Sequence, residues 1–117
     1  IDLNKAELVW QVPVGEGSAA IRNHPLLKGV KLPERLGSPA NGGAIATAGG
    51  LIFIGGGDGY FYALDKNTGR ELWRGRVPYV NIENTMTYRT RAGRQFVLAS
   101  TGAGPDASLV AFALEPR

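Results

Sequence analysis

The chain has 117 residues, enough for one small domain, and it contains 17 glycines, 7 prolines and no cysteine. Its formal net charge of +3 comes from scattered basic residues, with no basic run of the kind that a nucleic-acid or membrane surface uses. The lack of cysteine excludes disulfides, thiolate metal sites and cysteine nucleophiles. The many glycines and prolines favour an all-β chain rich in turns.

Residues 2–10 repeat the pattern of residues 65–73. In both segments Asp precedes Trp by eight positions, and Asn recurs two positions after the Asp. Short side chains in an Asp-x-Asn segment bond to nearby backbone N–H groups and form a turn, and the strand that follows carries a Trp whose ring must pack outside its own sheet. The repeat predicts that residues 1–14 end a preceding unit, with its docking Trp and outer strand.

Residues 15–41 are expected to form a long loop that covers one face of the next unit, because they contain three prolines and no clear period. Long loops inside compact domains tend to be functional or disordered. His24, the only histidine of the chain, lies in this segment. No carboxylate or second histidine stands at a useful spacing from it, so an ordinary loop residue is favoured over a base or a metal ligand.

Residues 42–78 contain the clearest pattern of the chain. Four short runs are separated by turns rich in Gly, Asp and Asn, and they cover Ala44–Ala48, Leu51–Ile54, Tyr60–Leu64 and Glu71–Val77. Runs of this length and spacing predict an antiparallel meander. Asp58 and Asp65 lie in its turns and are expected to accept backbone hydrogen bonds rather than to bind calcium.

Residues 79–117 repeat this unit without its final strand. Gln95–Ser100 resembles the run that begins at Leu51, and Leu109–Glu115 resembles the run that begins at Tyr60. Four strands in about 40 to 50 residues are typical of a β-propeller blade. The expected fold is therefore an all-β fragment of a β-propeller, with about two four-stranded antiparallel blades and a long loop. In a closed propeller, the missing outer strand comes from the other end of the chain.

Three motifs then carry a family resemblance. Ala63-x-Asp65-x-x-x-Gly69-x-Glu71-x-Trp73 resembles the tryptophan-docking repeat of the dehydrogenases that depend on pyrroloquinoline quinone (PQQ), which are eight-bladed quinoproteins. Residues 42–55 and Thr85–Tyr88, the latter followed by Gly93–Val97, are similar to segments near the C-terminus of the same family. The docking repeat alone also occurs in non-catalytic propellers. The ordered set is more specific and covers almost the whole chain except residues 15–35.

The resemblance implies a PQQ-dependent oxidoreductase that oxidises a sugar or alcohol hydroxyl. Trp10–Gly15 is most similar to the glucose dehydrogenase branch. In the full-length protein the family implies PQQ at the propeller centre with a calcium ion, an upstream aspartate as base, hydride transfer to the quinone, and a quinone or cytochrome as electron acceptor. It also implies a periplasmic location, with any membrane anchor upstream. The fragment itself is expected to be inactive, to bind no cofactor and to hold no catalytic residue or metal ligand.

Two residues of this chain are candidates for contact with the cofactor. The family position that contacts the quinone is Asn41, whose amide can hydrogen-bond to a quinone or carboxylate oxygen, and Gly42 lets the backbone come close. An Asn-Gly turn that opens a strand is an equally good interpretation. Glu83 and Asn84 precede an inner strand, where a solvated loop is favoured over a role in the central channel. Residues 101–106 lack the features of a phosphate loop and are a candidate for lining the channel mouth.

A scaffold propeller is the alternative function, similar to the lipoprotein of the outer-membrane barrel assembly machinery. Residues 41–55 together with Thr85–Tyr88 favour the enzyme, because a scaffold needs only the docking frame. The chain opens without methionine and shows neither a signal peptide nor a spanning segment, so we expect it to be the tail of a longer protein. No nucleic-acid partner is expected, and the isolated piece is expected to self-associate through its open strand edges.

Overall fold

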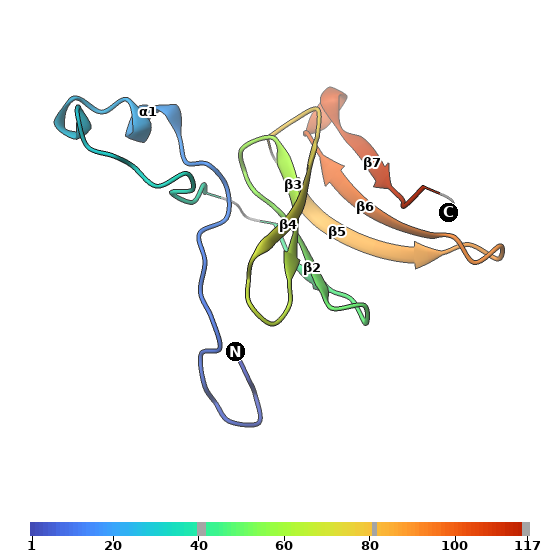
Figure 1. Ribbon diagram of the computed structural model, residues 1–117. Coiled ribbons are helices and arrows are strands. Elements are labelled where there is room, and N and C mark those ends of the chain that lie inside the picture. The colour runs from blue at the N-terminus through green and yellow to red at the C-terminus, as the bar shows by residue number, and fades with distance from the viewer. Residues whose placement is uncertain (40–41, 81, 116–117) are drawn as a thin grey trace.

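The computed structural model describes residues 1–39, 42–80 and 82–115. Two antiparallel sheets lie side by side, and a long N-terminal segment approaches the first of them (Figure 1). The elements in chain order are α1 (Ala19–Arg22), the 3-10 helix η1 (Pro25–Leu27), β1 (Ile45–Ala46), β2 (Leu51–Gly55), β3 (Tyr60–Asp65), β4 (Glu71–Arg76), β5 (Ile82–Arg89), β6 (Gln95–Thr101), η2 (Gly104–Asp106) and β7 (Ser108–Phe112). This nearly all-β architecture confirms the expected fold class.

The first sheet is a meander with strand order β1-β2-β3-β4. Its turns form where the sequence places residues that bond to their own backbone or tolerate positive φ. Asp65 accepts hydrogen bonds from the N–H groups of Asn67 and Thr68, both at 2.9 Å, and Gly69 takes φ +71°. Asp58 accepts a hydrogen bond from the N–H of Tyr60 at 3.1 Å. Both aspartates therefore hold turns, as their positions predicted.

The second sheet has strand order β5-β6-β7. β5 and β6 pair from Thr85 with Ala99 to Arg89 with Gln95, and the register shifts between Ile82 and Thr85. This irregularity is a β-bulge, which bends the strand and re-aims the side chains at that point. The shift lies at the start of β5, close to the first sheet.

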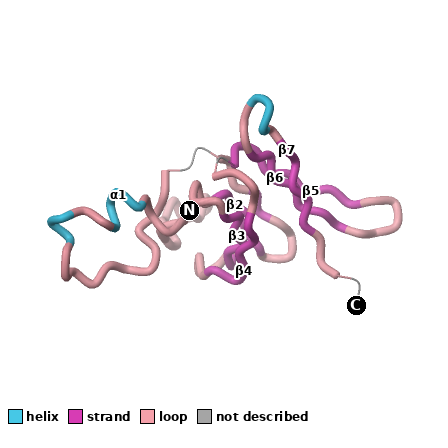
Figure 2. The backbone as a smooth tube through the Cα atoms, turned by 90° about the horizontal axis from the view of Figure 1, so that it is seen from above, coloured by secondary structure: helices cyan, strands magenta, loops and turns pink. Residues whose placement is uncertain are grey.

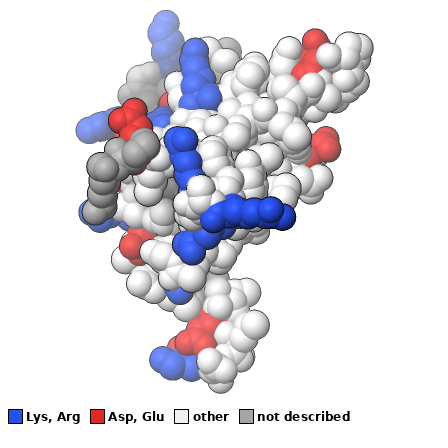
Figure 3. Space-filling model, turned by 90° about the vertical axis from the view of Figure 1, so that its right-hand side faces the viewer, with Lys and Arg blue, Asp and Glu red and all other residues white. Residues whose placement is uncertain are grey.

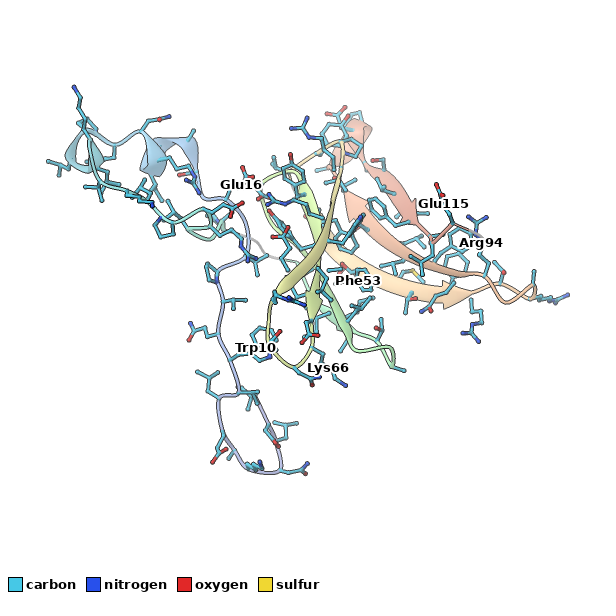
Figure 4. The ribbon with its side chains drawn as sticks, in the orientation of Figure 1. Trp10, Glu16, Phe53, Lys66, Arg94 and Glu115 are labelled. Atoms are coloured by element: carbon cyan, nitrogen blue, oxygen red, sulfur yellow. The ribbon has the colours of Figure 1, made fainter. Side chains whose placement is uncertain are left out.

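The core lies between the two sheets. Phe61 from β3 is fully buried, and its ring stacks on Phe53 at 5.9 Å and on Phe112 at 5.7 Å between centroids. Phe53 points into this space in Figure 4. The other buried members of the cluster are Val77, Ile82, Val97 and Ala99. Because each large side chain contributes about 1.5–3 kcal/mol on burial, this packing is what joins one sheet to the next.

Both tryptophans pack outside their own local unit, as their positions predicted. The Nε1–H of Trp10 donates to the Lys66 carbonyl at 2.9 Å, and the Trp10 ring lies over Gly69, beside the β3–β4 turn (Figure 4). Trp73 meets Phe112 of the second sheet edge to face, with centroids 5.1 Å apart. Residues 8–14, all described, lie outside any strand, which differs from the expected outer strand. They have no neighbouring strand with which to share backbone hydrogen bonds, and only Asp2 and Glu7 form a bridge.

The long loop covers the sheet only with its two ends. Gly15 and Ser38 lie together, where the Ser38 N–H donates to the Val14 carbonyl at 2.8 Å, and Glu16 bonds to Asp58 of the first sheet. The middle of the loop, with α1 and η1, projects away from both sheets in Figures 1 and 2. The expectation that the whole loop covers one face is therefore wrong, because charged and polar contacts hold only its base.

No helix among the described residues is long and apolar enough to cross a membrane.

Candidate functional site

One end of the paired sheets carries the base of the long loop. The antiparallel order places residues 56–59, residues 77–80 and residues 102–107 at this same end, and the turns 47–50, 66–70 and 90–94 at the other. Binding residues lie disproportionately on loops that a rigid scaffold positions. We therefore treat this loop-bearing end as the candidate site.

Gly42 lies where the first sheet approaches the second at this end. A Cβ on Gly42 would overlap with the carbonyl oxygen of Ile82, and the Gly43 N–H donates to the carbonyl of Glu83 at 3.1 Å. Gly42 is thus required for the close approach of two backbones, which is a packing reason for the glycine. Its contact with a cofactor stays a prediction. Asn41, the other predicted contact, lies outside the described residues.

Glu83 and Asn84 lie inside β5, not in a loop before it. Sequence reasoning missed this because the β-bulge extends the strand across a polar stretch without alternation. The Asn84 N–H donates to Ser100 Oγ at 3.2 Å. Beside them is an open hollow of about 520 Å³, lined by Glu83, Ser100, Thr101, Gly102, Ala103, Gly104, Ala107, Ser108 and Leu109. The Gly-rich loop therefore lines a hollow at the loop-bearing end.

Asp58 joins a turn of the first sheet to the long loop. Its Oδ2 accepts hydrogen bonds from the Tyr62 hydroxyl at 2.6 Å and from the Glu16 N–H at 2.9 Å. Burial raises the pKa of Tyr62 well above its ordinary value, and the hydrogen bond to Asp58 adds to the shift. Tyr62 is therefore a neutral donor at physiological pH. Its role was missed because Tyr62 reads as one apolar member of a strand.

Arg74 is the centre of a charged network at the base of the loop. Its guanidinium contacts Glu71 at 2.8 Å, Glu16 at 2.9 Å and Glu34 at 3.5 Å, and it lies 5.6 Å from the Tyr60 ring centroid. Glu71 also pairs with Arg35 of the loop at 3.3 Å. Two loop carboxylates and one loop cation thus meet the outer face of β4. Sequence alone could not find this network, because its members lie up to 58 positions apart.

The histidine and the acidic side chains of the described ranges do not gather into a metal site. His24 is exposed, and its Nδ1 accepts a hydrogen bond from the Leu26 N–H at 3.3 Å, so it caps η1. Within the described ranges, no three His, Cys, Asp or Glu side chains converge in a way that could hold a metal ion. At Gly42 the carbonyl oxygen of Ile82 lies where a Cβ would otherwise fit.

Comparison with known proteins shows what this arrangement is part of. Residues 1–97 match the family model described as the β-propeller domain of glucose/ethanol/alcohol dehydrogenase (PQQ). The chain is 40% identical over 108 residues to a probable quinate dehydrogenase (quinone) of Xanthomonas campestris pv. juglandis, a match that covers 87% of this chain and 13% of the relative. It is 34% identical over 126 residues to the quinate/shikimate dehydrogenase (quinone) of Acinetobacter baylyi, covering 98% and 15% respectively.

A third relative, quinoprotein glucose dehydrogenase A of Acinetobacter calcoaceticus, is 34% identical over 103 residues, covering 87% of this chain and 12% of the relative. The chain thus spans only a small part of the length of the curated relatives it matches. The family match includes the docking Trp10, the complete first sheet, all of β5 and only the beginning of β6. The chain belongs to the family of PQQ-dependent glucose, ethanol and alcohol dehydrogenases, and it corresponds to part of their β-propeller domain.

Proposed function

We propose that the full-length protein is a PQQ-dependent oxidoreductase that oxidises a sugar or alcohol hydroxyl, with hydride passing to the bound quinone. The observation that carries this proposal is the ordered match over residues 1–97, together with the docking of Trp10 on Gly69. The relatives described above are dehydrogenases by name. That favours the enzyme over a non-catalytic scaffold, for which the docking frame alone would suffice.

For the substrate, we propose a cyclic compound with several hydroxyl groups. Trp10–Gly15 supports the glucose dehydrogenase branch, and a glucose dehydrogenase is among the relatives. The two quinate dehydrogenases, at 40% and 34% identity, favour quinate as a second candidate. Glucose and quinate are both polyhydroxylated rings, so one kind of site can bind either, and a direct comparison of substrates is needed to choose between them.

We propose that this chain supplies part of the wall around the cofactor and not the catalytic base. Two adjoining sheets cannot enclose a ligand that a whole ring of blades surrounds, so the isolated chain should be inactive and should bind neither PQQ nor calcium. Asn41 remains the proposed contact, since its amide can donate to a carboxylate or quinone oxygen. Gly42 itself lies close to the backbone of Ile82.

We further propose that the full-length protein acts in the periplasm, with any membrane anchor upstream of this chain, and passes electrons to a quinone or a cytochrome. The names of the two quinate dehydrogenases mention a quinone. The name of a lupanine 17-hydroxylase of Pseudomonas, which is 41% identical over 80 residues, mentions cytochrome c. These names describe the relatives, and they support either acceptor for this protein.

The test uses the full-length protein loaded with PQQ and calcium. Glucose, quinate and glycerol are each supplied with an artificial electron acceptor, and we expect PQQ-dependent reduction of the acceptor with glucose or quinate. The 117-residue chain is the control and should give none. In the full-length protein, Asn41→Ala should weaken PQQ binding measured by equilibrium dialysis, while Asn4→Ala should not. Absence of PQQ-dependent turnover with every hydroxyl substrate would contradict the proposal.

We also propose that the isolated chain self-associates. Among the described strands β7 pairs only with β6, and the outer face of the second sheet exposes Met86, Tyr88 and Leu109. On the right-hand side of the molecule, which Figure 3 shows, white surface surrounds several Lys and Arg side chains. Sedimentation should show oligomers that Leu109→Glu weakens, because an unpaired edge and an apolar face invite a second copy. A stable monomer at high concentration would rule this out.

A further inference from the structure

The tip of the long loop, residues 19–33, has a surface that the proposed enzymatic function does not use. This tip contains α1 and η1 and projects away from both sheets in two perpendicular views (Figures 1 and 2). Its aliphatic residues Ile21, Leu26 and Val30 are 51%, 85% and 54% exposed. Single exposed aliphatic residues are common, but three within ten positions on one projecting segment form a local apolar surface.

The charges of the tip all have one sign. Residues 19–33 include Arg22, Lys28 and Lys31 and no Asp or Glu. Lys28 and Lys31 are exposed, and no ion pair among the described residues involves either of them. The acids that flank the tip, Glu16 and Glu34, contact Arg74 at the base of the loop instead. The fold therefore separates the acids at the base from the cations at the tip.

Arg22 closes the neck of the loop from inside. Its Nε donates to the Glu16 carbonyl at 2.7 Å, and its Nη2 donates to the carbonyl of Glu34 and, at 3.4 Å, to that of Pro33. The Gly37 N–H also donates to the Gly15 carbonyl at 3.1 Å. A neck held in this way presents the tip in a preformed shape, so less conformational entropy is lost when the tip binds a surface.

We propose that residues 19–33 dock onto an anionic phospholipid surface. The aliphatic side chains enter the boundary between headgroups and acyl chains, while Lys28 and Lys31 stay among the lipid phosphates. The tip contains no Phe, Tyr or Trp, although aromatic anchors dominate protein interfaces, and its projecting shape suits an extended surface. The cations are spread over ten positions, so they form no run in the sequence. This inference is independent of the enzymatic proposal.

The test measures flotation of the 117-residue chain with lipid vesicles in a density gradient, because self-associated chains without lipid do not float. We expect binding to vesicles of equal parts phosphatidylcholine and phosphatidylglycerol, little binding to phosphatidylcholine alone, and weakening with salt. The double variant Lys28→Gln/Lys31→Gln should lower partitioning about 25-fold, at about fivefold for each lysine near an anionic surface. Lys5→Gln/Lys66→Gln, which removes two exposed lysines elsewhere, is the charge-matched control and should bind as the wild type does.

A second measurement reports insertion directly. The chain has no cysteine, so Leu26→Cys carries a single environment-sensitive fluorophore, whose emission should shift to the blue on mixed vesicles, while a label at Asn4→Cys should not respond. Circular dichroism checks that each variant keeps its strands. The proposal is overturned if no vesicles are bound, if both lipid mixtures bind equally, or if the tip and control variants lose binding to the same extent. Capture of an acidic protein without any vesicle binding would also overturn it.

Discussion

The packing of Trp10 on Gly69 gives the most direct test of how one blade docks on the next. Gly69 takes φ +71°, and a Cβ added there would lie 2.5 Å from Trp10 Cε3 and 2.9 Å from Cδ2 and Cζ3. Gly69→Ala therefore causes two separate problems. The alanine is strained in the left-handed region, and its methyl group collides with the indole ring, which must shift and weaken its hydrogen bond to the Lys66 carbonyl.

Gly93 is a matched control for the first problem alone. It takes φ +83°, and apart from Gly93 and its two chain neighbours no described residue has an atom within 4 Å of a Cβ built on it. Gly93→Ala should cost about 1–2 kcal/mol, the penalty of an L-residue in the left-handed region. Gly69→Ala should cost about 1–3 kcal/mol more, because overpacking a filled contact adds a penalty of that size. The difference between the two variants measures the docking contact.

The assay is urea unfolding followed by circular dichroism, with tryptophan fluorescence as a second probe. We expect the unfolding midpoint to fall further for Gly69→Ala than for Gly93→Ala, and the tryptophan emission of folded Gly69→Ala to shift to the red as Trp10 loses its cover. Equal destabilisation of the two variants, with unchanged emission, would show that Trp10 does not dock on Gly69. The same pair can be compared in the full-length protein.

Three further predictions concern the buried and titrating groups. Phe61 stacks on the rings of Phe53 and Phe112. Phe61→Ala should therefore lower the free energy of unfolding by about 3–5 kcal/mol, and Phe61→Leu should lower it by less. Urea unfolding measures the effect of both variants. Burial and the hydrogen bond to Asp58 raise the pKa of Tyr62 from 10.0. The stabilisation that Tyr62 contributes is therefore complete below pH 10 and is lost as the pH rises through the pKa of the folded state. Above pH 10, the free energy of unfolding should fall less for Tyr62→Phe than for the wild type. Hydrogen bonds from the hydroxyl and the backbone N–H of Thr68 hold the pKa of Asp65 below 3.8. The stabilisation that Asp65 contributes is therefore present above pH 3.8 and is lost as the pH falls through the pKa of the folded state. Asp65→Asn should remove the loss of stability in acid that Asp65 causes.

Each of these three has a clear contradicting result. Equal stability of Phe61→Ala and the wild type would mean that the two sheets do not pack through this ring. Tyrosine ionisation can be followed by the absorbance of tyrosinate at 295 nm. If every tyrosine titrated with the ordinary pKa of 10.0, the raised pKa of Tyr62 would be contradicted. Identical acid unfolding of the wild type and Asp65→Asn would show that the turn hydrogen bonds of Asp65 do not favour its charged form.

The local features of the chain follow from the sequence alone. The runs separated by Gly-rich turns predicted the meander of β1 to β4, and the repeated Asp-to-Trp spacing predicted that Trp10 packs outside its own unit. Asp58 and Asp65 could be placed in turns because short side chains bond to backbone groups a few residues away. The turns depend on neighbours within about ten positions, and the prediction for Trp10 depends on a repeated motif; a single sequence displays both directly.

Only the tertiary structure decided which distant groups meet. It placed Glu83 on a bulged strand beside Ser100 and not in a loop, and it filled the space at Gly42 with the backbone of β5. It also brought the carboxylates of Glu16 and Glu34 to Arg74, so no ion pair among the described residues involves Lys28 or Lys31. The physical reason is that hydrophobic packing between the sheets sets these positions, and side chains that are 40 or more positions apart then pair wherever the packed backbones bring them together.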